Sequence, residues 1–130
     1  MPASKHGSEQ YVKYTYTTDS VDSRPTSWEI ALHAGSPGNG DDNEVADGSY
    51  ARQSATFAAS DQGSFWQAAS DIDVTFPAAS ASANYTVTHF TVRDALSGEC
   101  KSIGVLPVPI PVVEGGVVSL PAGSIIVRGV

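Results

Sequence analysis

Short runs in which apolar and polar residues alternate are the feature that most constrains the fold of this chain. In residues 71–76, for example, Ile72, Val74 and Phe76 are separated by polar neighbours. Because successive side chains of a strand point to opposite faces, such a run predicts a strand with one buried face. Comparable runs predict further strands at 11–17, 28–34, 50–57, 85–94, 101–106, 117–120 and 124–130.

The composition favours the same class of structure. Val, Ile and Thr together number 29, whereas Leu and Met together number 5. β-Branched side chains pack well on a pleated surface and lose rotamer freedom in a helix. With the turn signals between the runs, this predicts an all-β fold, an antiparallel β-sandwich of jelly-roll or Greek-key type with about eight short strands. No window predicts a long helix, and at most one helical turn is expected within 59–70.

The chain of 130 residues is long enough for one core of ordinary size. Residues 1–10 are polar and carry no periodic pattern, so we expect a flexible N-terminal arm, or one that becomes ordered only against a partner. Residues 11–130 are expected to form a single β-sandwich domain.

The prolines of the run PVPIPV are spaced by two, at Pro107, Pro109 and Pro111. In an extended chain, alternate N–H groups point to the same side, so three donors are missing from one side only. Val108 and Ile110 keep their donors on the other side. The run can therefore pair on one side and not on the other, which predicts the edge of a sheet.

The charge balance excludes several kinds of partner. The net charge is −7 and the seven basic residues are scattered singly. Affinity for nucleic acid and for anionic membranes comes mainly from clustered Lys and Arg, so neither is expected as a partner. No apolar run approaches the length of a membrane-spanning helix. Cys100 is the only cysteine, so no disulfide can form within the chain.

No motif predicts catalysis, a metal site or a cofactor. The acidic, glycine-rich stretch 35–49 could bind calcium or remain a solvated loop, and its spacing does not match an EF-hand. The three histidines are too scattered for zinc. Asp71 and Asp73 share one face of an alternating strand, which is an ordinary place for aspartate and gives little support to glycosidase chemistry.

Two sets of residues are candidates for a role in binding or in fixing the acidic loop. Phe65 and Trp66 lie together among small residues, either as an interface anchor or folded onto the core. Val108 and Ile110, on the proline run, are further interface candidates. Tyr50 and Arg52 share a strand face directly after the acidic loop. Arg52 either bridges this loop to the sheet through a carboxylate such as Glu44 or Asp47, or is an exposed strand arginine.

An ordered set of short motifs spans about residues 28–127. It comprises Ala31-Leu32-His33-Ala34, Pro37-Gly38, Asn43-Glu44-Val45, Tyr50-Ala51-Arg52-Gln53, Phe76-Pro77-Ala78-Ala79, Val87-Thr88-His89-Phe90, Asp94-Ala95, Ser97-Gly98 and Ala122-Gly123. This set resembles a family of small tailed-bacteriophage virion proteins that are often called tail fibre-like. The chain departs from the family pattern at Glu99-Cys100, where members often have glycines. The resemblance implies a non-enzymatic structural protein, located in the virion after assembly in the cytoplasm of the bacterial host.

The leading hypothesis is a capsid decoration (cement) protein that binds the outside of the shell and stabilises it. Its partners would then be the major capsid protein and its own copies, as a homotrimer by analogy with threefold capsid sites. The chain has neither a repetitive shaft nor a separate attachment domain, which a fibre would normally need. The alternative is a tail-fibre or baseplate component with a receptor- or glycan-binding surface. A carbohydrate-active enzyme on a jelly roll is a third hypothesis, and it requires two converging carboxylates.

Overall fold

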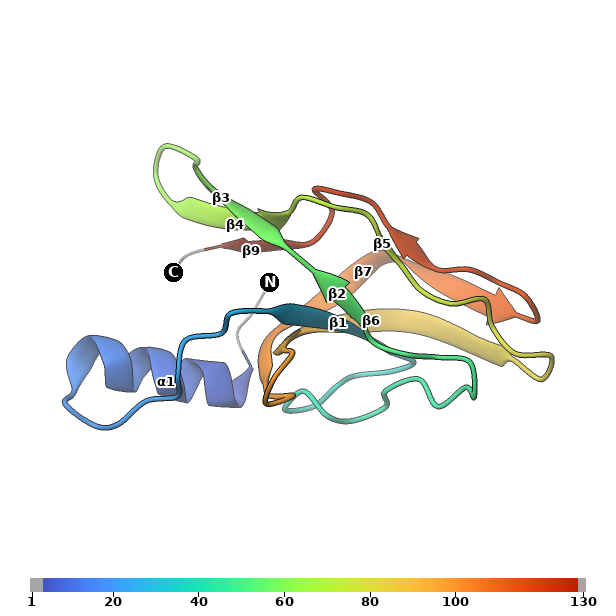
Figure 1. Cartoon of the computed structure of the whole chain (residues 1–130), viewed down its shortest axis with the longest axis horizontal. Coiled ribbons are helices and arrows are strands. Elements are labelled where there is room, and N and C mark those ends of the chain that lie inside the picture. Colours follow the sequence, from blue (N-terminus) through green and yellow to red (C-terminus); the bar gives the residue numbers. More distant parts are fainter. Residues whose placement is uncertain (1–3, 129–130) are drawn as a thin grey trace.

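The computed structural model describes residues 4–128, which form one helix and nine strands in an antiparallel β-sandwich (Figure 1). In chain order the elements are α1 (Lys5–Tyr16), β1 (Trp28–His33), β2 (Gln53–Ala55), β3 (Phe57–Asp61), β4 (Trp66–Ser70), β5 (Val74–Thr75), β6 (Asn84–Asp94), β7 (Cys100–Val113), β8 (Ser119–Leu120) and β9 (Ile126–Arg128). Each strand pairing is antiparallel. The prediction of an all-β antiparallel sandwich is confirmed.

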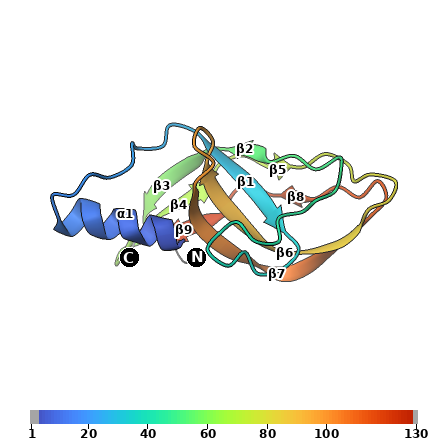
Figure 2. The ribbon, with the colours of Figure 1, turned by 90° about the horizontal axis from the view of Figure 1, so that it is seen from below.

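The strands form one four-stranded sheet and two smaller ones. The large sheet has the order β2-β1-β6-β7, and the smaller sheets are β3-β4-β9 and β5-β8. The chain passes from the large sheet to the second layer at Thr56, the single residue between β2 and β3. In Figures 1 and 2 the two smaller sheets lie across one face of the large sheet.

The core fills the space between these layers. Its buried side chains are Ile30, Leu32, Val45, Ala55, Val74, Phe76, Ala79, Val87, Phe90, Val92, Leu106, Val112, Val118, Leu120 and Ile125. The inward residues of β1 alternate as expected, since Ile30 and Leu32 are fully buried. Ala31 and His33, on the other face of β1, are buried as well. The large sheet is therefore covered on both faces in this region, and the cover on its outer face is the stretch 35–49.

The strand expected over 11–17 is wrong, because these residues belong mostly to α1. Ser4 caps this helix, since its Oγ accepts a hydrogen bond from the amide of Gly7 at 2.9 Å. Lys13 pairs with Glu9 one turn earlier at 2.7 Å. Alternation misled the prediction because Val12 and its aromatic neighbours have no core to face: no residue of α1 is buried. Residues 5–10 of the expected arm form the first half of the helix, and residues 1–3 lie outside the described part.

Residues 59–70, where at most one helical turn was expected, contain none. These residues form the hairpin of β3 and β4, in which Asp61 is paired with Trp66. The hairpin turn is closed by a hydrogen bond from the amide of Gln62 to the carbonyl of Phe65 at 2.8 Å. Gly63 has φ +98°, a conformation that glycine adopts without strain.

The proline run lies at the edge of the large sheet, as predicted. It is part of β7, which is the last strand in the sheet order. Pro111 is paired with Thr86 on β6. The register of the β6–β7 pair shifts between Val87 and His89, and Pro107 and Pro109 lie opposite this shift. Outside the prolines, the start of this edge is covered by Ser4, whose amide donates to the carbonyl of Lys101 at 3.3 Å.

Replacing Gly104 with alanine tests how tightly β6 and β7 pack. Gly104 is paired with Phe90, and a Cβ at this position would overlap the Phe90 ring. We expect Gly104→Ala to lower the free energy of unfolding by about 1–3 kcal/mol, as overpacking does in other cores. Urea denaturation measures this loss. Gly48→Ala is the matched control, because its Cβ would meet no atom within 4 Å, and equal midpoints for the two variants would contradict the packing argument.

Candidate functional site

Arg52 is the centre of an ion-pair cluster at the edge of the large sheet. Its Nε and Nη2 donate to the two carboxylate oxygens of Glu44 at 2.9 and 2.8 Å, a bidentate arrangement. Its Nη1 donates to Glu29 Oε1 on β1 at 2.9 Å. The three side chains are each less than a third exposed. Arg52 therefore joins the loop 35–49 to β1.

Tyr50 completes this cluster and links it to the core. Its hydroxyl donates to Glu44 Oε2 at 2.6 Å and accepts from the backbone amide of Leu32 at 3.1 Å. Its ring stacks on that of Phe76, with centroids 6.2 Å apart. Burial raises the pKa of the Tyr50 hydroxyl, so this group remains a neutral donor.

The electrostatics of Glu44 are those of a structural carboxylate. The hydrogen bonds from Arg52, and to a smaller extent the one from Tyr50, lower the pKa of Glu44 from 4.5 to about 2. A general acid needs a pKa near the working pH. Glu44 instead stays ionised and holds two donors in place.

Asp47 does not contact Arg52. It accepts hydrogen bonds from the amide of Ser80, at 3.0 Å, and from the Ser80 hydroxyl, so it ties the end of the loop to the segment before β6. These bonds lower the pKa of Asp47. Of the four residues singled out for the loop, the structure brings Glu44, Tyr50 and Arg52 together and places Asp47 on a different anchor.

The first half of the loop is held by two side chains of the outer sheet face. His33 Nδ1 lies 2.7 Å from the carbonyl oxygen of Asp42, and His33 Nε2 lies 3.0 Å from Thr91 Oγ1. Arg93 donates to the carbonyl of Gly40 at 2.6 Å and pairs with Asp41. His33 is fully buried, and burial lowers its pKa. No sequence pattern indicates these two anchors, because β1 and β6 bring them to the loop only in the folded chain.

The carboxylates of the acidic loop and of the pair Asp71 and Asp73 have separate local partners. In the loop, Asp41, Glu44 and Asp47 bind three different groups, and within residues 4–128 no three His, Cys, Asp or Glu side chains are placed to hold a metal ion. Asp71 accepts from the Thr56 hydroxyl, and Asp73 accepts from the amide of Ala122 at 2.8 Å. These two carboxylates therefore have different partners. The one described helix is too short and too polar to cross a membrane.

The aromatic candidates lie on the β3–β4 hairpin. Trp66 begins β4 and is 60% exposed. Phe65 precedes it in the turn, and the guanidinium of Arg128 lies 5.4 Å from the centre of its ring. These residues do not meet Val108 and Ile110, which lie on β7 and belong to a second surface.

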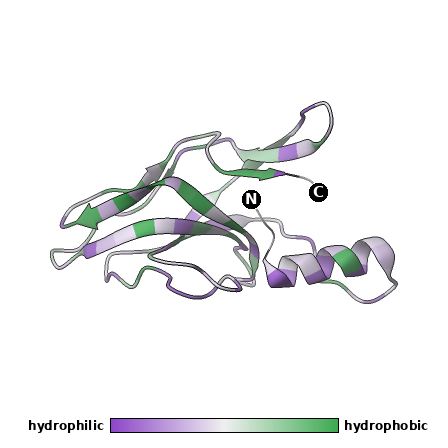
Figure 3. Ribbon diagram, turned by 180° about the vertical axis from the view of Figure 1, so that it is seen from behind, coloured by the Kyte–Doolittle hydropathy of each residue, from purple (hydrophilic) through white to green (hydrophobic). Residues whose placement is uncertain are grey.

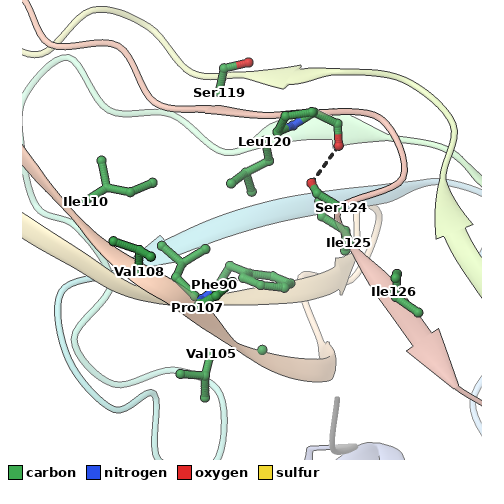
Figure 4. Close-up of a pocket in the computed structure, with 13 residues that line it drawn as sticks. Phe90, Val105, Pro107, Val108, Ile110, Ser119, Leu120, Ser124, Ile125 and Ile126 are labelled. Atoms are coloured by element: carbon green, nitrogen blue, oxygen red, sulfur yellow. Dashed lines mark hydrogen bonds between the residues drawn. The ribbon is translucent and has the colours of Figure 1, made fainter.

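That second surface is an apolar groove between β7 and the segment that leads from β8 to β9 (Figure 4). Its volume is about 710 Å³. In Figure 4, Val108 and Ile110 lie on one side, Leu120 and Ile125 on the other, with Phe90 between the two sides. The full lining is Phe90, Gly104, Val105, Leu106, Pro107, Val108, Ile110, Ser119, Leu120, Pro121, Ser124, Ile125 and Ile126. None of these side chains carries a charge.

The sequence indicated only one wall of this groove. The proline run marked β7 as an edge, and it drew attention to Val108 and Ile110. The opposite wall, from Ser119 to Ile126, reaches β7 only because the smaller sheets cross the large one. We name the thirteen lining residues together the β7 groove.

Glu44→Gln tests the ion-pair cluster through the pH dependence of stability. Because the folded pKa of Glu44 lies below its ordinary value, its contribution is fully present above pH 4.5 and is lost as the pH falls toward about 2. We expect Glu44→Gln to lower the free energy of unfolding by on the order of 2 kcal/mol at neutral pH, with a difference from wild type that shrinks below pH 4.5. Chemical denaturation at a series of pH values measures both.

Glu114→Gln serves as the control, because Glu114 is exposed in the turn after β7. The free energy of unfolding of Glu114→Gln should equal that of the wild type at every pH. A difference between Glu44→Gln and wild type that stays constant down to pH 2 would contradict the proposed role of the charge.

Comparison with known proteins assigns the chain to a family. No curated protein matches the sequence. Residues 2–128 match the family described as "Podophage GP4 fiber I protein gp80", which covers nearly the whole chain. The earlier resemblance to phage virion structural proteins is confirmed at this level, although the match does not test the individual motifs. The chain belongs to the podophage GP4 fiber I protein gp80 family and is a structural protein of the phage virion.

Proposed function

We propose that the chain is a structural component of the virion fibre, which attaches to neighbouring virion proteins by burying apolar surface and has no catalytic role. The observation that carries this proposal is the match of residues 2–128 to a family described as a fibre protein. The site geometry supports it. Arg52, Glu44 and Asp47 are engaged in holding a loop, whereas the β7 groove offers apolar surface.

Capsid decoration, the leading hypothesis from the sequence, becomes the second candidate. The compact β-sandwich of residues 4–128 supports it, and its partner would be the major capsid protein. The description of the family favours the fibre. In both roles the protein attaches by burying apolar surface. The two roles differ in how many binding positions the particle offers.

The number of copies per virion separates these two functions. We expect quantitative mass spectrometry of purified particles to give a small number of copies, in multiples of three or six. Immunogold labelling should place them on the fibres. A copy number comparable with that of the major capsid protein would overturn the fibre proposal in favour of decoration.

Trp66 is proposed as a contact with another virion protein. Trp66 is 60% exposed, so Trp66→Ala removes a large apolar surface without opening the core. We expect the thermal unfolding midpoint to stay close to that of the wild type, while incorporation into virions falls several-fold in an amber-suppression complementation assay. Val117→Ala, also at an exposed position, is the control and should be incorporated normally. Equal incorporation of both variants would rule out Trp66 as a contact.

A further inference from the structure

Helix α1 is only partly covered by its own chain, because Tyr11 and Tyr14 line a hollow with Val21 and Pro25 and both remain exposed. None of its residues is buried, and Tyr14 is 79% exposed. Only its beginning is fixed to the sandwich, because Ser4 donates to the carbonyl of Cys100 at 2.5 Å. From there the helix projects beyond the strands (Figures 1 and 2). A helix of about 12 residues is marginally stable in water without tertiary packing.

One face of α1 is free of charge. At 100° per residue, the charged residues Lys5, Glu9 and Lys13 fall within one quarter of the helix circumference. Tyr11, Val12 and Tyr14 lie on the remaining side, with only Gly7, Ser8 and Thr15 between them. Figure 3 shows the resulting mixture of hydrophilic and hydrophobic colour along the helix. We call Tyr11, Val12, Tyr14 and Thr15 the tyrosine face.

The return segment 17–27 does not cover this face completely. It is held through the polar side of α1, where the amide of Asp22 donates to Gln10 Oε1 at 2.6 Å and the Asp22 carboxylate pairs with His6 at 2.5 Å. Tyr11 remains 45% exposed. The tyrosine face therefore presents apolar rings to the surroundings of the molecule.

The β7 groove has the matching chemistry. Its lining is free of charge, and Val105 and Val108 at its rim are 66% and 72% exposed. Pro107, which lines the groove, supplies a carbonyl acceptor and no N–H donor. Tyrosine combines a ring that packs on proline and valine with a hydroxyl that donates to such a carbonyl.

We propose that the tyrosine face of α1 from one copy of this chain docks in the β7 groove of a second copy. The helix of the same copy does not reach the groove, because Ser4 fixes α1 at the start of β7 and the helix runs away from the sandwich. The contact is a helix in an apolar groove, with anchors at Tyr11 and Tyr14.

This contact joins two different surfaces, so it is head-to-tail. Each copy contributes its helix to one contact and its groove to another. A series of such contacts either closes into a ring or continues as a filament. A ring of three would be the homotrimer expected by analogy with threefold capsid sites. The inference does not depend on whether the chain belongs to the fibre or to the capsid surface, since it uses only surfaces of the chain itself.

Sedimentation of the purified chain over a range of concentrations tests the proposal. We expect the wild type to associate, and Tyr14→Ala and Val108→Glu each to weaken association at least tenfold. Lys5→Ala, on the charged side of α1, and Val113→Glu, on β7 outside the groove, are the matched controls, and each should change the association constant less than twofold. All four positions are exposed, and circular dichroism checks that each variant folds.

Mixing the two interface variants tests the head-to-tail geometry. Val108→Glu retains an intact helix, and Tyr14→Ala retains an intact groove, so their mixture should form dimers although neither variant associates alone. A wild type that stays monomeric at millimolar concentration would overturn the proposal. It would also be overturned if the controls weakened association as much as the test variants, or if the mixture formed no dimers. None of these results bears on the copy number in the virion.

Discussion

The bidentate ion pair between Arg52 and Glu44 is the interaction on which much of the sandwich depends. It fastens the loop 35–49 to the large sheet and, through Glu29, to β1. The fastened loop in turn covers the outer face of that sheet, where His33 and Arg93 are buried and bind its carbonyls. The inner face is covered by the two smaller sheets. A chain with a lean apolar core thus protects its central strands on one face by packing and on the other by polar contacts.

Local patterns in the sequence were sufficient for the strands that have one clear inner face. Alternation located β1 and β6 closely, and the prolines identified β7 as an edge. The same pattern failed at Val12, where the side chains that alternate are all exposed on a helix. Serine is favoured at helix N-caps, so Ser4 is a signal for this helix that the alternation over residues 11–17 obscured.

The candidate site was predictable to the extent that it is local in the chain. Glu44, Tyr50 and Arg52 lie within nine residues of one another, so a shared strand face next to an acidic loop pointed to them. Their link to Glu29, and the far wall of the β7 groove around Ile125, depend on which strands become neighbours. Periodicity fixes which side of a strand is buried, but it does not determine sheet order, and contacts between sheets follow from that order.

The proline edge also limits strand pairing between copies of this chain at high concentration. Proteins of a virion assemble at high local concentration, where an unprotected sheet edge pairs readily with any other edge. On β7 the carbonyl of Lys101 is occupied by Ser4, and the far half of the strand has lost the N–H groups of three prolines. Ladder growth, the first step toward fibrillar aggregates, is thereby obstructed along this strand. Copies that meet at this edge can associate only through side-chain contacts, which are selective and reversible.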